Sequence, residues 1–170
     1  EVGPAHNRRG TTVPFHPDAL IFGAGAAFKP ARLFQMARSK AYLQRGVQIR
    51  WKCAQERLKS GDETPLEAVL HFPNGLADFL SELTKSKRAI VNEPFAGRSE
   101  KNGPHGRVEW AVTWVADGFG EADGFTRSYC NTIYTPDGGF HEAGLRAALA
   151  KGLKAYAELK GNKKAGLISP

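Results

Sequence analysis

Apolar and polar residues alternate along several short stretches of the chain, which is the period of a strand with one buried face. The alternation is cleanest in residues 47–53, and further strands are predicted at residues 66–72, 108–115 and 128–133. The glycines of residues 118–124 predict a hairpin between the last two strands. The apolar positions of the first and third stretches are Val47, Ile49, Trp51, Cys53, Val108, Trp110, Val112 and Trp114.

Other stretches carry apolar residues at the wider spacing of an amphipathic helix. Pro30 suits a first helical turn and Gly46 suits a stop, so a helix is predicted between them. Asn74 is a suitable N-cap for a second helix. A third helix of about twenty residues is predicted from Phe140 onward. The apolar stripes of the second and third helices are Leu76, Phe79, Leu80 and Leu83, and Leu145, Leu149, Leu153 and Tyr156.

Glycine, proline and charged residues mark the connections. Residues 1–10 and 92–106 predict loops, the second being the least ordered stretch of the chain, and residues 11–15 predict a short strand. Residues 23–27 predict a flexible joint. No repeat is present and no linker divides residues 20–160. This order predicts an α+β fold in two layers, with a mixed sheet covered on one face by helices.

The composition fits one domain. The chain has 170 residues, 41% of them hydrophobic, which is enough to bury a core. No apolar run approaches the roughly 20 residues of a membrane helix and no signal peptide opens the chain, so a cytoplasmic protein with no membrane contact is predicted. Cys53 and Cys130 are far apart and neither belongs to a Cys-x-x-Cys pair, so we expect two reduced thiols.

Charge is distributed unevenly along the chain. Residues 1–60 carry 11 Lys and Arg against 3 Asp and Glu, residues 61–146 carry 8 against 13, and residues 147–170 carry 5 against 1. The basic ends favour a surface that meets a polyanion, because Lys and Arg release counterions condensed on phosphates. A solvated surface with ordinary solubility charge is the alternative.

Residues 128–149 combine a strand, a Gly-Gly turn and a helix start in the order SYCNTIYTPDGGFHEAGLRAAL. This segment resembles the transducer region of the B subunits of bacterial type IIA DNA topoisomerases, and it is more similar to the B chain of topoisomerase IV than to that of gyrase. The departures from the family pattern are Phe140, where Thr is usual, and Tyr134, where a smaller or polar residue is common. Collinear matches extend the resemblance over nearly the whole chain: GTTVPFHPDALIF at 10–22, KPARLFQMARSKAYLQRGVQIRW at 29–51, HFPNGLADFLSEL at 71–83 and VEWAVTWV at 108–115.

The resemblance implies a role inside a larger protein. Residues 1–18 correspond to the tail of an upstream ATP-binding domain, and residues 19–170 to a transducer domain that is incomplete at its C-terminal end and lacks the family's ATP-sensing Gln-Thr-Lys loop. Such a domain relays ATP binding and hydrolysis to DNA strand passage, and its fold includes a left-handed βαβ crossover. In this view Gly23 and Gly25 form a hinge.

The resemblance also implies what the chain binds. ATP and Mg²⁺ belong to the full-length subunit, so we expect no cofactor, no metal and no catalytic residue in this chain, which should be inactive alone. The expected partners are double-stranded DNA, the A subunit of topoisomerase IV and a second B subunit.

The same family motif implies DNA-contact and turn roles for several residues. Arg146 is expected to contact DNA phosphates inside the cavity of the subunit dimer, with Lys151 and Lys154 nearby. The alternative for Arg146 is an ion pair with Glu142, one helical turn earlier. The turn and motif positions are Gly138, Gly139, His141 and Gly144.

Catalytic readings of the same segment fail on spacing. His141 and Glu142 begin like a metalloprotease helix, but Leu145 stands where the second His is required. Ser128, His141 and Asp137 suggest a triad, but no strand-turn-helix nucleophile elbow surrounds the serine. Two other classes of function remain open: a self-standing basic module that binds RNA or DNA, and a protein-interaction domain whose charge is incidental.

Overall fold

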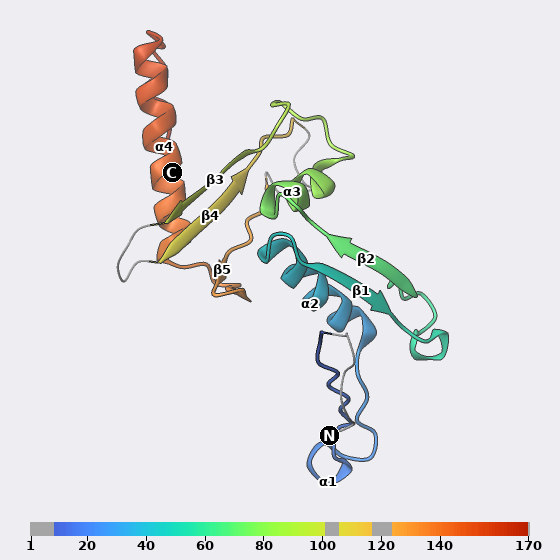
Figure 1. Cartoon of the computed structure of the whole chain (residues 1–170). Helices are drawn as coiled ribbons and strands as arrows, with labels where there is room; N and C mark the ends of the chain where they lie inside the picture. Colours follow the sequence, from blue (N-terminus) through green and yellow to red (C-terminus); the bar gives the residue numbers. More distant parts are fainter. Residues whose placement is uncertain (1–8, 101–105, 117–123, 170) are drawn as a thin grey trace.

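The computed structural model describes residues 9–100, 106–116 and 124–169 (Figure 1). The helices are α1 (Ala19–Phe22), α2 (Pro30–Leu43), α3 (Leu76–Thr84) and α4 (Phe140–Leu159), with short 3₁₀ turns η1 (Gln55–Arg57) and η2 (Ala165–Leu167). The strands are β1 (Gln48–Lys52), β2 (Glu67–His71), β3 (Phe95–Glu100), β4 (Arg107–Val112), β5 (Tyr129–Cys130) and β6 (Ile133–Tyr134). The predicted α+β class is confirmed.

The strands form three separate two-stranded antiparallel sheets, β1 with β2, β3 with β4, and β5 with β6. These sheets replace the single mixed sheet that the sequence predicted. Because no two strands pair in parallel among the described residues, the left-handed βαβ crossover is not found in that part of the chain. The difference from the prediction arises at β3, which lies inside residues 92–106, a stretch that the sequence predicted as a loop. This strand pairs with β4 from Phe95↔Val112 to Glu100↔Arg107. The partner of β4 is therefore an upstream strand, and β4 does not pair with the described residues of 128–133. The turn predicted at residues 118–124 lies, except for Gly124, outside the described residues.

The stretch predicted as a strand at residues 128–133 is itself a tight hairpin. Asn131 and Thr132 have φ angles of 46° and 67° and reverse the chain between β5 and β6. Positive φ at both central residues is characteristic of a type I′ turn, which favours Asn and Gly. Thr132 is β-branched, so this backbone costs on the order of 1–3 kcal/mol and must be held by its surroundings.

The remaining predicted elements lie close to their predicted bounds. The helix α2 has Pro30 at its first turn, and β1 shows the predicted alternation of exposed and half-buried residues. The N-cap of α3 is Gly75 and not Asn74. Asn74 instead donates its backbone N–H and its Nδ2 to the carboxylate of Asp78, at 2.7 and 3.0 Å. Residues 11–15 form no strand.

The core lies between α2, β2 and α3. It consists of Ala41, Tyr42, Leu70, Phe72 and Phe79. The rings of Tyr42 and Phe79 are stacked, with centroids 3.8 Å apart and an interplanar angle of 18°. Aromatic side chains contribute much of the buried apolar area here, so this cluster is the main source of stability for the first half of the chain.

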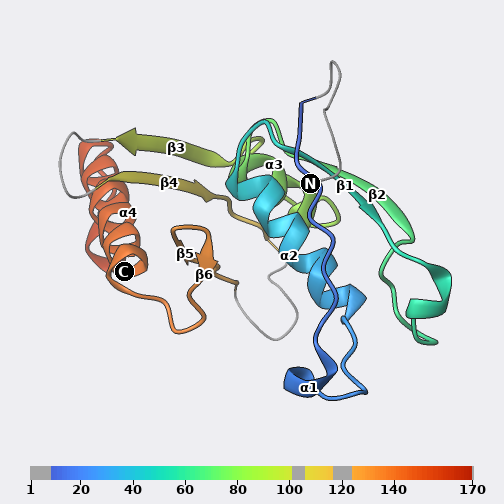
Figure 2. The same ribbon diagram turned by 60° about the horizontal axis from the view of Figure 1, so that its bottom comes forward.

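The helix α4 stands at one end of the molecule, beside the β3–β4 sheet, while α2 and the β1–β2 sheet occupy the other end (Figures 1 and 2). Its predicted apolar stripe is only partly covered. Leu145 and Leu149 are half-buried, whereas Leu153 and Tyr156 are exposed. Across the described part of the chain, no helix has the length and apolarity needed to span a membrane.

Candidate functional site

The turn before α4 depends on two glycines. Gly138 has a φ angle of 71° and Gly139 a φ angle of 152°. A Cβ atom on Gly138 would lie 3.1 Å from Oε2 of Glu142, and one on Gly139 would lie 2.9 Å from Cε1 of His141. The glycines therefore allow the first turn of α4 to fold its side chains back over the turn. Gly144 is different, because a Cβ atom there would meet nothing within 4 Å.

Those side chains form a chain of hydrogen bonds at the base of α4. Nε2 of His141 lies 3.3 Å from Oγ1 of Thr135, which lies 2.8 Å from Oγ of Ser128. Ser128 Oγ is in turn 3.1 Å from Oε2 of Glu142, so the hydroxyl protons can all point toward the carboxylate. Asp137 takes no part, and Thr135 separates Ser128 from His141.

Arg146 completes the same network. Its Nε and Nη2 donate to Oε1 of Glu142 at 3.2 and 3.1 Å, and its Nη2 also donates to Oγ1 of Thr126 at 2.7 Å. The ion pair with Glu142, the alternative raised by the sequence, is therefore present. The Arg146 side chain is still 54% exposed, so its remaining N–H groups can reach a ligand.

Lys151 and Lys154 lie farther along α4 and are exposed, with no ion pair or hydrogen bond to the described residues. At about 100° per residue, Lys151 points roughly 140° and Lys154 roughly 80° away from Arg146 around the helix axis. The three predicted DNA-contacting residues therefore do not form one cluster. Arg146 faces Thr126, in the segment before β5, and the two lysines face outward.

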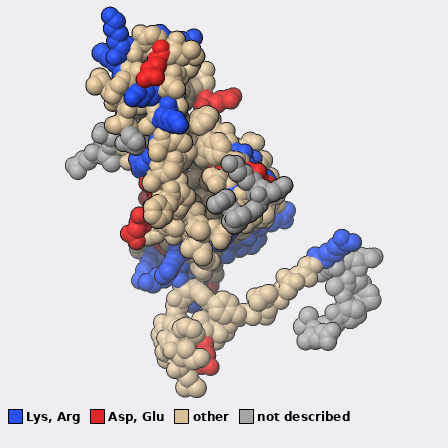
Figure 3. Space-filling model, turned by 90° about the vertical axis from the view of Figure 1, so that its left-hand side faces the viewer, with Lys and Arg blue, Asp and Glu red and all other residues tan. Residues whose placement is uncertain are grey.

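The distal half of α4 and the residues after it are basic. Glu158 is the only acidic residue of residues 147–170, against five lysines. Seen from the α4 side, several blue side chains and a red one lie on a mostly tan surface at this end of the molecule (Figure 3). Lys160 is partly engaged, since its Nζ lies 5.6 Å from the ring centroid of Tyr156.

The predicted hinge glycines lie far from this network in the sequence. Gly23 ends the short helix α1 with a φ angle of 83°, and its N–H donates to the carbonyl of Ala19. A Cβ atom on Gly25 would meet nothing within 4 Å. The positive φ gives Gly23 a local reason to be glycine, and the hinge role stays a prediction.

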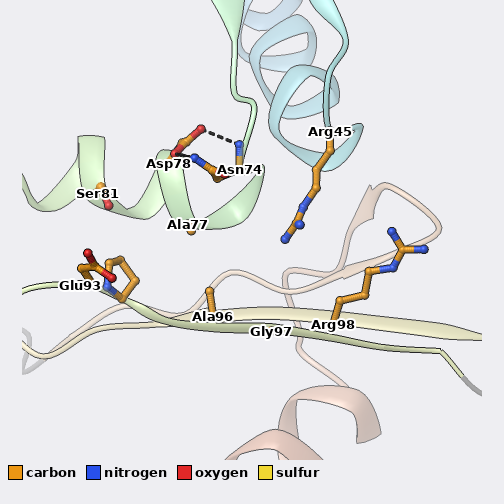
Figure 4. Close-up of a pocket in the computed structure, with 10 residues that line it drawn as sticks. Arg45, Asn74, Ala77, Asp78, Ser81, Glu93, Ala96, Gly97 and Arg98 are labelled. Carbon is orange, nitrogen blue, oxygen red and sulfur yellow. Dashed lines mark hydrogen bonds between the residues drawn. The ribbon is translucent and has the colours of Figure 1, made fainter.

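A hollow of about 490 Å³ between α3 and β3 is the other candidate site (Figure 4). Three of the four charged side chains that line it have partners: Arg45 Nε donates to Glu109 Oε1 at 2.7 Å, Arg98 Nη2 donates to Glu100 Oε2 at 2.7 Å, and the Asp78 carboxylate accepts from Asn74. The fourth, Glu93, has no ion pair or hydrogen bond to the described residues. The Arg98 guanidinium holds the pKa of the Glu100 carboxyl below its usual value. Among the described residues, no group of three or more His, Cys, Asp or Glu side chains could hold a metal ion.

The sequence did not predict two polar contacts that α2 makes. Tyr42 of α2 shares a hydrogen bond with the hydroxyl of Tyr129, and burial together with this bond raises the pKa of Tyr42. Lys40 of α2 donates to both oxygens of Thr132. No local signal could have found either pair, because the partners are 87 and 92 residues apart.

Comparison with known proteins finds relatives that match nearly the whole chain. The sequence model of the DNA gyrase B family matches residues 75–169. The chain is 61% identical to the B subunit of DNA topoisomerase 4 from Caulobacter vibrioides and 49% identical to the one from Bartonella bacilliformis, in each case over 99% of this chain. It spans 24% of the length of these relatives.

Solved structures share the fold. The 43K ATPase domain of Thermus thermophilus gyrase B, in complex with an aminocoumarin, has a TM-score of 0.64 and 27% identity, covering 85% of this chain and 36% of that one. The B-subunit of the DNA gyrase from Myxococcus xanthus has a TM-score of 0.59 and 25% identity, covering 79% of this chain and 38% of that one. The likeness therefore includes the arrangement of elements as well as the sequence motifs.

Proposed function

Because this chain belongs to the DNA gyrase B family, we propose that it is the part of a type IIA topoisomerase B subunit that relays ATP binding and hydrolysis to DNA strand passage. The relatives at 61% and 49% identity are named as B subunits of DNA topoisomerase 4, which favours topoisomerase IV over gyrase. The partners that follow are double-stranded DNA, the A subunit of topoisomerase IV and a second B subunit. Other parts of the full-length protein would bind ATP and Mg²⁺, and the enzyme would be an isomerase of DNA topology.

The observation that carries the DNA role is the outward basic surface of α4. Lys151 and Lys154 are exposed and form no ion pair with the described residues. Such lysines attract phosphate groups without reading base sequence, which is what an enzyme acting on any duplex segment requires. Arg146 adds a third contact, with its charge partly neutralised by Glu142.

The shape of α4 supports a relay. A helix of twenty residues is a rod about 30 Å long. The rod is fixed at its base by the hydrogen bonds of Ser128 to Glu142 and of Arg146 to Thr126. A small rotation imposed at this base moves the lysines of the distal half by a larger distance, so a change near the hairpin is passed to the DNA.

DNA affinity as a function of salt tests the DNA role. The double variant Lys151→Ala/Lys154→Ala should lower the slope of log affinity against log salt by about 1.8, at about 0.9 per phosphate contact. The control is Lys59→Ala, an exposed lysine in the loop between β1 and β2. An equal slope in the double variant and the wild type would rule out Lys151 and Lys154 as phosphate contacts.

The enzyme role is tested in the full-length protein combined with its A subunit. ATP-dependent decatenation without supercoiling supports topoisomerase IV. Supercoiling of relaxed DNA would instead identify a gyrase. Strand passage that does not require ATP would overturn the relay itself.

A further inference from the structure

The two ends of the molecule are joined by the segment that contains the β5–β6 hairpin. In Figures 1 and 2 this hairpin lies between α2 and the base of α4. It contacts α2 through two side chains, Lys40 and Tyr42. It contacts α4 through Ser128, the residue directly before β5, which bonds Glu142.

The contact of Lys40 is made to a strained residue. Nζ of Lys40 lies 2.8 Å from the carbonyl oxygen of Thr132 and 2.8 Å from its Oγ1. Thr132 has a φ angle of 67°, a backbone conformation that a β-branched residue adopts only when its surroundings hold it. One ammonium group therefore binds both oxygens that this conformation presents. The contact is partly buried, which protects it from screening by water and salt.

The same turn fixes the strand that reaches α4. Its reversal sets the pairing of Tyr129 with Tyr134, and the N–H of Thr135 then donates to the carbonyl of Ser128 at 2.9 Å. Ser128 directs its hydroxyl to Glu142, which holds Arg146. A shift of the turn therefore moves the partners of Glu142.

We propose that Lys40 is a positioning residue that holds the β5–β6 turn in its strained conformation and thereby sets the orientation of α4 relative to α2. The functional consequence of this role rests on the proposed relay function: motion of α2 would reach the DNA-contacting lysines through the hairpin. The ordinary alternative is a lysine that packs on the hairpin without controlling it.

The test combines two substitutions. Lys40→Met keeps the length and apolar stem of the side chain and removes the ammonium group. Thr132→Gly removes the strain, because glycine adopts positive φ freely, while the carbonyl and the turn remain. Lys59→Met is the matched control for the loss of one lysine.

The first readout is the turn itself, measured in this chain by the NMR backbone couplings and chemical shifts of residue 132. In Lys40→Met we expect Thr132 to leave the positive-φ region, and in Lys40→Met/Thr132→Gly we expect the turn to be restored. A wild-type turn in Lys40→Met would overturn the inference. This readout does not depend on DNA or ATP, so it separates a failure of the inference from a failure of the proposed function.

The second readout is strand passage per ATP hydrolysed in the full-length protein with its A subunit. Lys40→Met should lower this ratio several-fold, the double variant should recover most of it, and Lys59→Met should match the wild type. A loss that Thr132→Gly does not rescue would show that Lys40 acts by some other contact. An unchanged ratio in Lys40→Met would also reject the positioning role, even if the lysines of α4 prove to bind DNA.

Discussion

Arg146 allows the sharpest distinction between a DNA contact and a structural ion pair. Its guanidinium group has five N–H donors, and Nε and Nη2 are engaged by Glu142 and Thr126. The Nη1 group remains for a phosphate oxygen. The perturbation is Arg146→Ala, with Glu142→Gln as its companion.

A DNA contact and a structural ion pair at Arg146 predict different changes in DNA affinity and in stability. The loss of one phosphate contact should lower the slope of log affinity against log salt by about 0.9. When salt rises from 50 to 200 mM, the DNA affinity of Arg146→Ala should therefore fall by a factor about 3.5-fold smaller than the DNA affinity of the wild type. The stability loss should be small, a few tenths of a kcal/mol for the exposed pair and about 1 kcal/mol for the bond to Thr126. Glu142→Gln removes a negative charge beside Arg146 and should raise affinity at low salt.

The assay is fluorescence anisotropy of a labelled duplex, titrated with each variant at several salt concentrations. Thermal unfolding of each variant shows whether the chain remains folded at the assay temperature. A wild-type salt slope in Arg146→Ala, with the fold intact, would refute the phosphate contact and leave Arg146 as a partner of Glu142 alone. A lower affinity of Glu142→Gln at low salt would contradict the charge argument as well.

Three further predictions concern stability and can be measured by chemical or thermal unfolding. Gly138→Ala should destabilise the chain by about 1–2 kcal/mol, because alanine is strained at a φ angle of 71°. Gly144→Ala, in the second turn of α4, should instead stabilise it by up to about 1 kcal/mol, and equal effects would contradict the role given to the turn. Phe79→Ala should lower the free energy of unfolding by about 3–5 kcal/mol, because Phe79 is only 6% exposed. Phe140→Ala should change it by less than about 0.5 kcal/mol, because Phe140 is 97% exposed. A large loss in Phe140→Ala would contradict the exposure of that side chain. The raised pKa of Tyr42 means that the folded state keeps the phenol proton at a pH where the unfolded chain has lost it. The contribution of Tyr42 to the free energy of unfolding is therefore complete below pH 10.0 and is lost as the pH rises above that value. Tyr42→Phe should remove this part of the pH dependence of stability, and an unchanged pH dependence would reject the argument.

Local sequence determined the elements whose signals lie within a few residues. The alternation around Ile49 fixes β1, Pro30 fixes the start of α2, and the spacing from Phe140 onward fixes the length of α4. The Gly-Gly turn and its motif were also readable, because the positive φ angles at Gly138 and Gly139 have a local cause. These are short-range effects of backbone geometry and amphipathic period, and they also carried the family resemblance.

Strand pairing was decided only by the tertiary structure. Residues 95–100, FAGRSE, show no clear alternation of apolar and polar residues and give no strand signal alone, yet they pair with β4 along its whole length. The reversal at Asn131 and Thr132 was equally hidden, because a β-branched residue at positive φ contradicts its own local preference. The contact that accompanies it comes from Lys40, 92 residues away.

The candidate site divides in the same way. The sequence named Arg146 and the two lysines of α4 as DNA contacts, which stays a prediction, and helix geometry turns the lysines away from Arg146 around the axis. It named Glu142 as a possible partner of Arg146 and gave no sign of Thr126. Residue types and their spacing determine which chemistry is available, while the partners of each charge depend on packing between distant segments, whose free energies no local pattern contains.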